Sequence, residues 1–159
     1  MLKVESRAKG FTLIELITTV AIVAILASVA TPMLQATVQR KKESELKESL
    51  RQIRLAIDAY KQASDDGRIK KSVDETGYPP NLEILVEGAV DLKSPKENKL
   101  KFLRRIPRDP MRSVQDSDKL WGLRSYESDA DSPAEGSDVY DVYSLSDKIG
   151  TNKIPYAKW

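Results

Sequence analysis

The feature that most constrains this chain is a long apolar run near its beginning. From Phe11 to Gln39 the only ionisable side chain is Glu15, and the 24 residues that follow it are uncharged. A helix needs about 20 residues to cross the ~30 Å hydrocarbon core of a bilayer, so the run is long enough to span a membrane. It is apolar on all sides rather than striped, which indicates surroundings of lipid or closely packed helices.

Two other interpretations of this run are a core helix of a soluble protein and a cleavable secretory signal. A core helix is usually shorter and striped. A signal would explain the net positive charge of residues 1–10 and the small residues around Ala30, where a signal peptidase could cut. However, the apolar run continues beyond Ala30, and a charge at Glu15 costs about 2.5–3.5 kcal/mol in the apolar zone of a membrane. A carboxylate kept there indicates a specific cationic partner.

Helical character continues past the apolar run. Within residues 40–62 one apolar face is formed at steps of four, three, four and three residues, by Leu46, Leu50, Ile53, Ile57 and Tyr60. We therefore predict one helix over about residues 11–64, ended by Asp65-Asp66-Gly67. Pro32 lies inside it, and because proline removes a helical donor we expect a kink or local unwinding there.

Composition excludes several classes of function. The chain has no histidine and no cysteine, which removes the usual general base, thiolate chemistry, disulfides and the common zinc sites. With 26 basic and 24 acidic residues the net charge of +2 gives no electrostatic case for nucleic acid. No nucleophile-base pair, phosphate loop or dinucleotide motif is present. We predict that the chain is not an enzyme and has no catalytic residue.

The remainder of the chain predicts a small mixed head. We expect a short helix within 78–88, opened by proline and closed by glycine, and an extended segment over 101–110. Two strands, 121–126 and 139–145, should form a hairpin joined by residues 127–138. This connection holds five carboxylates, and we interpret it as a solvated loop rather than a calcium site.

The residues at the start of the apolar run carry a family resemblance. They read Lys9-Gly10-Phe11-Thr12-Leu13-Ile14-Glu15-Leu16. This string resembles the class III leader junction of type IV pilins and type II secretion pseudopilins. Pro32 also lies where that family has its helix-breaking proline. The resemblance implies that a prepilin peptidase cuts between Gly10 and Phe11 and methylates the new amine of Phe11. It also implies an orientation, leader inside and head outside, which the basic residues on both sides of the span do not decide.

Glu15 fits an assembly role beside this resemblance. After cleavage it would lie four residues from the protonated amine of Phe11. In a filament, the amine of one subunit could meet Glu15 of a neighbour and neutralise it in an apolar interior. The alternative is that Glu15 merely lies at the level of the lipid headgroups, where its cost is small.

The head resembles that of the major pseudopilins of type II secretion, through segments in the order YPPNLEIL, RIPRDP, WGLRSY and YDVYSLS. This implies a pilin-like α+β fold, in which a long helix packs on a small antiparallel sheet. The implied parts are a cleaved leader (1–10), a transmembrane and polymerisation helix (11–39) and a soluble head (40–159). The implied protein is a single-pass inner-membrane protein with a periplasmic head, which polymerises with itself and other pseudopilins on an inner-membrane assembly platform and drives protein export.

One departure from that family concerns calcium. Many major pseudopilins bind calcium after the final strand, but residues 146–153 here hold one carboxylate and two lysines. Calcium takes six to eight oxygen ligands, usually including several carboxylates, so we predict no metal and no cofactor at this position. Two alternative functions stay open, a type IV pilin that builds surface fibres and a monomeric membrane-anchored binding protein. The lack of a cysteine pair favours the pseudopilin over the pilin.

Overall fold

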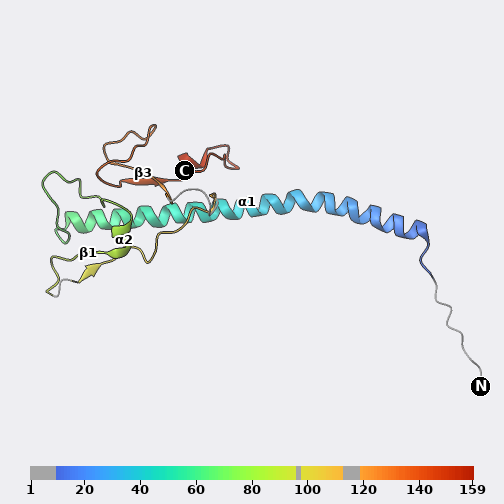
Figure 1. Cartoon of the computed structure of the whole chain (residues 1–159), viewed down its shortest axis with the longest axis horizontal. Helices are drawn as coiled ribbons and strands as arrows, with labels where there is room; N and C mark the ends of the chain where they lie inside the picture. Colours follow the sequence, from blue (N-terminus) through green and yellow to red (C-terminus); the bar gives the residue numbers. More distant parts are fainter. Residues whose placement is uncertain (1–9, 96–97, 113–118) are drawn as a thin grey trace, which may run out of the picture. The chain divides into compact units, whose positions relative to one another are not determined.

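The structure, a computed structural model, describes residues 10–95, 98–112 and 119–159. The chain divides into two compact units, Met1–Gln39 and Arg40–Trp159. One helix, α1 (Leu13–Asp65), contributes residues to both (Figure 1). The other elements belong to the second unit, which we call the head, and the fold is the predicted α+β pilin-like one, a long helix with small antiparallel sheets.

Helix α1 confirms the predicted long helix to within two residues at each end. It runs without interruption through Pro32, so the local unwinding that we considered is not seen, and a kink stays a prediction. A proline removes a single helical donor, and the turns on either side keep their own hydrogen bonds. The helix ends as predicted, because Gly67 adopts the left-handed φ of 68° that glycine tolerates best.

The core of the head is built on the predicted apolar stripe. All five stripe residues are buried, and they pack with residues from the rest of the head, including Leu85, Trp121, Val139, Val142 and Tyr156. Most charged residues in the part of α1 that belongs to the head are exposed. The stripe therefore gives the helix one face that only its own head covers, as the periodicity predicts.

Two short antiparallel ladders complete the head. Strand β1 (Ala89–Val90) pairs with β2 (Lys99–Leu100), and β3 (Gly122–Arg124) pairs with β4 (Asp141–Tyr143). The second ladder confirms the predicted hairpin, although both strands are shorter than expected. The first ladder was not predicted, since two-residue strands are too short to show the alternation that identifies a strand.

The short helix α2 (Glu83–Glu87) lies within the predicted segment, but the prediction that proline opens it is wrong. The amide of Ile84 donates to Oδ1 of Asn81 at 3.0 Å, so an asparagine side chain satisfies the first turn after the two prolines have passed. Gly88 closes the helix as predicted, with a φ of 87°. A Cβ there would lie 2.8 Å from the carbonyl oxygen of Leu100, so a larger residue would clash with β2.

Candidate processing and assembly site

The predicted cleavage junction lies in the open. Gly10 precedes α1 outside any helix or strand, and apart from its chain neighbours no described atom lies within 4 Å of the position that a Cβ would take. The side chain of Phe11 is 80% exposed. The leader residues 1–9 lie outside the described residues. A peptidase could therefore reach the Gly10–Phe11 bond without unfolding any element of the described chain.

Thr12 caps the start of α1, and Glu15 lies in the first turn. The amide of Glu15 donates to Oγ1 of Thr12 at 3.3 Å, and the amide of Leu16 donates to the Thr12 carbonyl at 3.2 Å. Threonine followed three residues later by glutamate is the order of a capping box, a signal that is visible in the sequence. Glu15 also lies in the first turn, where the helix dipole favours negative charge. Glu15 thus contributes to starting the helix as well as to any pairing with another subunit.

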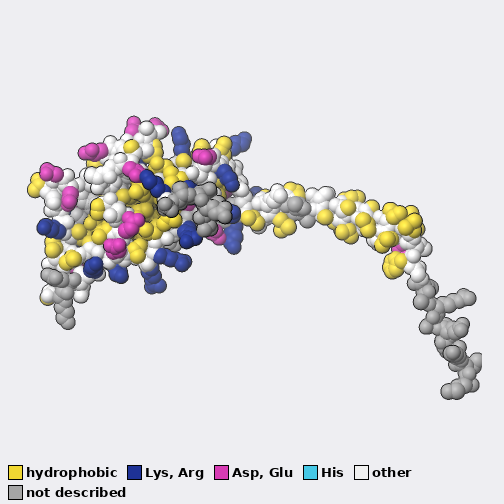
Figure 2. All heavy atoms as spheres, in the orientation of Figure 1, with side chains coloured by type: hydrophobic (Ala, Val, Ile, Leu, Met, Phe, Trp, Pro, Cys, Tyr) yellow, Lys and Arg dark blue, Asp and Glu magenta, His cyan; other side chains and the backbone are white. Residues whose placement is uncertain are grey.

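The first unit leaves its apolar side chains uncovered. From Phe11 to Val38 the large hydrophobic residues whose side chains the structure describes are 55–80% exposed. Figure 2 shows yellow side chains along this part of the helix. Soluble monomers rarely expose contiguous apolar patches larger than a few hundred Å². This segment is also long and apolar enough to cross a membrane, and none of its apolar window is buried inside the chain. It therefore requires lipid or other apolar helices around it.

Four hydroxyl groups in the described part of this segment donate to its own backbone. Thr19 Oγ1 donates to the Leu16 carbonyl at 2.8 Å, Ser28 Oγ to that of Ile25 at 2.7 Å, and Thr37 Oγ1 to that of Met33 at 2.9 Å. Thr18 makes the same kind of bond one turn back. In an apolar environment each unsatisfied polar group costs several kcal/mol. These bonds lower the cost of placing the hydroxyls in lipid or in a helix bundle. Glu15 is the charged group of this segment, and its carboxylate needs a cationic partner in such surroundings.

In the head, protein groups hold the segment where calcium was considered. The carboxylate of Glu43, which is buried, accepts bonds from the amide of Thr151 at 2.8 Å, from its hydroxyl at 2.6 Å and from the Tyr156 hydroxyl at 2.9 Å. We call this set the Glu43 clamp. Within the described ranges no group of three or more acidic residues is arranged to hold a metal ion. The clamp fixes the segment after β4 to α1 by direct hydrogen bonds.

The acidic connection 127–138 is not uniformly solvated. Asp138 is buried, and its Oδ1 accepts from the amide of Tyr126 at 2.8 Å while its other oxygen accepts from the Thr76 hydroxyl. This residue therefore closes the loop and is not available to a ligand. The other carboxylates are exposed, and one of them, Glu135, pairs with Lys119 at 2.7 Å.

Comparison with known proteins agrees with this geometry. The family model described as the prokaryotic N-terminal methylation motif matches residues 6–31, a stretch that contains the junction, Glu15 and most of the apolar segment. The type II secretion system core protein G of Pseudomonas aeruginosa is 32% identical over 105 residues, which cover 64% of this chain and 66% of that protein, just under two thirds of its length. No solved structure matches the chain.

The chain is a type IV pilin-like protein that carries the N-methylation motif, a class of structural and not enzymatic proteins. Within that class it is a distant homologue of the type II secretion core protein G. Its apolar N-terminal helix with the methylation motif is consistent with an inner-membrane prepilin.

Proposed function

We propose that this protein is the major subunit of a type II secretion pseudopilus. In this proposal a prepilin peptidase cuts between Gly10 and Phe11 and methylates Phe11, and the mature chain waits in the inner membrane with its head in the periplasm. An assembly platform then adds subunits to a filament, together with other pseudopilins, and the growing filament drives folded proteins across the outer membrane.

One observation carries the proposal: an apolar helix surface that no described residue covers, in a chain whose head has its own core. Lipid satisfies that surface before assembly and the helices of other subunits satisfy it afterwards, so moving from membrane to filament costs little hydrophobic free energy. The likeness to core protein G favours a secretion filament over a surface fibre.

Glu15 supplies specificity to this transfer. In a filament the methylated amine of Phe11 enters an apolar interior, where an uncompensated charge is costly. Glu15 of a neighbouring subunit provides the counter-charge, and breaking one side of a buried ion pair typically costs about 3–5 kcal/mol. Since every added subunit repeats the pairing, even part of that cost suppresses growth.

The test uses a strain that lacks the chromosomal copy and carries the wild type, Glu15→Val or Glu15→Asp. We expect Glu15→Val to be processed and to stay in the membrane, with neither filaments nor secretion, and Glu15→Asp to be intermediate because it keeps the charge at a shorter reach. The matched control is Glu45→Val, which replaces an exposed glutamate further along the same helix.

Three outcomes contradict parts of the proposal. Normal filaments with Glu15→Val would show that the ion pair is not required. Surface fibres without a secretion defect in the deletion strain would identify a type IV pilin. Normal function as a membrane-bound monomer, with no filament under any condition, would identify an anchored binding protein.

A further inference from the structure

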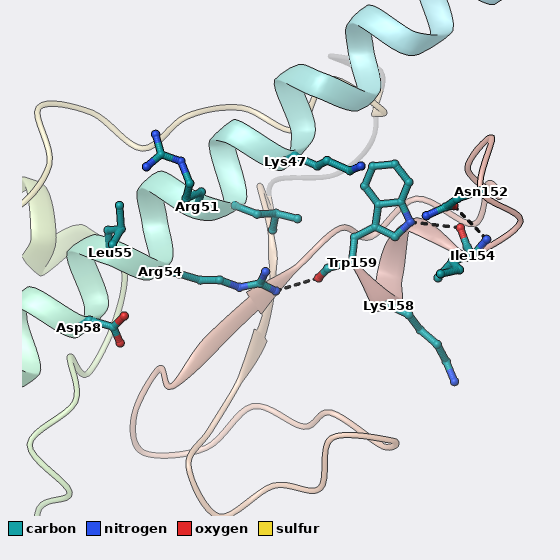
Figure 3. Close-up of a pocket in the computed structure, with 10 residues that line it drawn as sticks. Lys47, Arg51, Arg54, Leu55, Asp58, Asn152, Ile154, Lys158 and Trp159 are labelled. Atoms are coloured by element: carbon teal, nitrogen blue, oxygen red, sulfur yellow. Dashed lines mark hydrogen bonds between the residues drawn. The ribbon is translucent and has the colours of Figure 1, made fainter.

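A basic-edged groove lies on the head between α1 and the segment 152–159 (Figure 3). It has a volume of about 420 Å³. Its apolar lining includes Leu55, which is 54% exposed, Ile154, which is 44% exposed, and the indole of Trp159. Leu55 lies on the same helix as the buried stripe but points away from the core. The head therefore keeps a hollow apolar strip that its own side chains do not fill.

The edge of this groove carries more basic than acidic side chains. Four basic side chains line it, Lys47, Arg51, Arg54 and Lys158, against the single carboxylate of Asp58. Lys47 Nζ lies 4.7 Å from the centre of the Trp159 ring, and Arg54 Nε lies 2.7 Å from Oδ1 of Asp141. Lys158 makes no ion pair with any residue that the structure describes. Arg51 Nη2 likewise lies 2.8 Å from Oε1 of Glu48, so both arginines are paired with carboxylates, and the two lysines supply the positive charge beside the apolar floor.

The same chain carries a segment with the opposite properties. Residues 126–131 (YESDAD) begin with Tyr126, which is 58% exposed, and continue with the exposed carboxylates of Glu127, Asp129 and Asp131. Within the described part of the chain none of these three carboxylates forms an ion pair. The segment is also absent from the lining of the groove, so a chain does not satisfy its own groove with its own acidic segment.

We propose that the groove of one subunit binds the acidic segment 126–131 of a second copy of this chain. Opposite charges at the edge would steer and orient the contact, and the tyrosine ring would cover apolar floor. Groove and segment are different surfaces of one chain, so the contact is head-to-tail and leaves a free groove and a free segment at the two ends of any oligomer. Such a contact produces an open filament unless its rotation closes a ring. The inference rests on the proposed polymerisation and names a head contact within it.

Cross-linking of the full chain in its native membrane tests this contact. The protein has no cysteine, so introduced thiols react without background. We expect a chain that carries both Lys158→Cys and Asp131→Cys to give a ladder of covalent oligomers with a short bismaleimide. A mixture of the two single variants should give dimers only, and each single variant alone should give monomers. The pair Lys93→Cys and Asp131→Cys, with an exposed lysine that does not line the groove, is the matched control.

Charge reversal provides a second arm. Lys158→Glu should lower the yield of filaments about tenfold, because it places like charges opposite each other. Combining it with Asp131→Lys should restore the yield, and the loss should grow smaller as salt is raised.

Filaments that are visible by electron microscopy, but whose double-cysteine chain yields no ladder, would overturn the head contact and leave the proposed function standing. An equal ladder from the control pair would overturn it as well, because the cross-link would then report crowding rather than docking. Absence of filaments from the wild type itself would refute the proposed function, and the contact with it.

Discussion

The two parts of helix α1 share one secondary structure but differ in whether their apolar side chains are buried. In the first part, up to Gln39, the large apolar side chains surround the helix and stay exposed. In the second part apolar side chains recur on one face and are buried, and charged ones occupy the rest. Helix formation needs only local hydrogen bonds, so both patterns satisfy the backbone equally. What differs is the partner: the head covers the second part, and the first part is left for lipid or other subunits.

The largest expected effect concerns whether the apolar part survives processing. Mass spectrometry of the membrane-extracted wild type should show a chain that begins at N-methyl-Phe11. Gly10→Val should block the cut, so that the leader stays attached, the amine of Phe11 never forms and filaments are lost completely. Ala8→Val, a substitution of similar size within the leader, is the control and should be processed normally.

A mature chain that begins at Thr31 would contradict this prediction. It would mean that the apolar part is a disposable signal, and the contrast between the two parts of α1 would then have no role in the mature protein.

The next effect tests the buried stripe against an exposed residue on the same helix. In the head expressed as residues 40–159, Leu50→Ala or Ile53→Ala should lower the free energy of unfolding by about 2–5 kcal/mol, because each leaves a cavity at a fully buried site. Leu55→Ala is the matched control, since Leu55 is more than half exposed, and it should change stability by less than about 0.5 kcal/mol. Urea titration followed by circular dichroism measures all three. Equal losses would show that the head does not distinguish the two faces.

The stripe could be predicted from the sequence because a single periodicity fixes which face is buried. The Glu43 clamp could not be, because Glu43 lies in a run of charged residues (RKKESE) that is typical of a solvated helix surface. Its partner Thr151 is 108 residues away in the sequence, and only the folded head brings the two together. The β1–β2 ladder escaped prediction for a different reason, since its strands contribute two residues each.

The candidate site divides in the same way. The junction and Glu15 are local sequence signals, so they can be proposed from the sequence alone, and the structure adds the exposure of Phe11 and the capping by Thr12. The basic groove is not local, because it joins one face of α1 to residues near 159. Motifs within one segment are visible in a sequence, whereas surfaces that two distant segments share require the fold.

Breaking the Glu43 clamp should have an intermediate effect. Glu43→Gln keeps the size of the side chain but replaces a charged acceptor of three hydrogen bonds by an amide that cannot accept all of them. We expect a loss of about 1–3 kcal/mol in the free energy of unfolding of the head. Glu45→Gln is the control, because within the described ranges this exposed residue forms one ion pair, a 3.9 Å surface pair with Lys41. If the two variants have the same free energy of unfolding, the Glu43 clamp does not stabilise the head and the segment after β4 is held by its apolar contacts.

The smallest expected effect is a pH dependence that belongs to the head. The hydrogen bond from Arg68, 2.7 Å between Nη2 and Oδ2, lowers the pKa of Asp91 below its ordinary value, and the amide of Lys93 contributes in the same direction. Because the folded pKa is the lower one, the unfolded chain binds more protons between the two values. The stability from this pair is therefore fully present above the ordinary pKa of about 3.9 and is lost as the pH falls through the folded value.

Wild type should melt at a higher temperature than Asp91→Asn at pH 7, and the difference in melting temperature should shrink as the pH is lowered from about 5 to about 2. Asp74→Asn, which changes an exposed carboxylate without an ion pair in the described ranges, should follow the wild type throughout. A difference between wild type and Asp91→Asn that stays constant over this range would mean that the Arg68 pair contributes nothing to stability, and that Asp91 acts only through its uncharged shape.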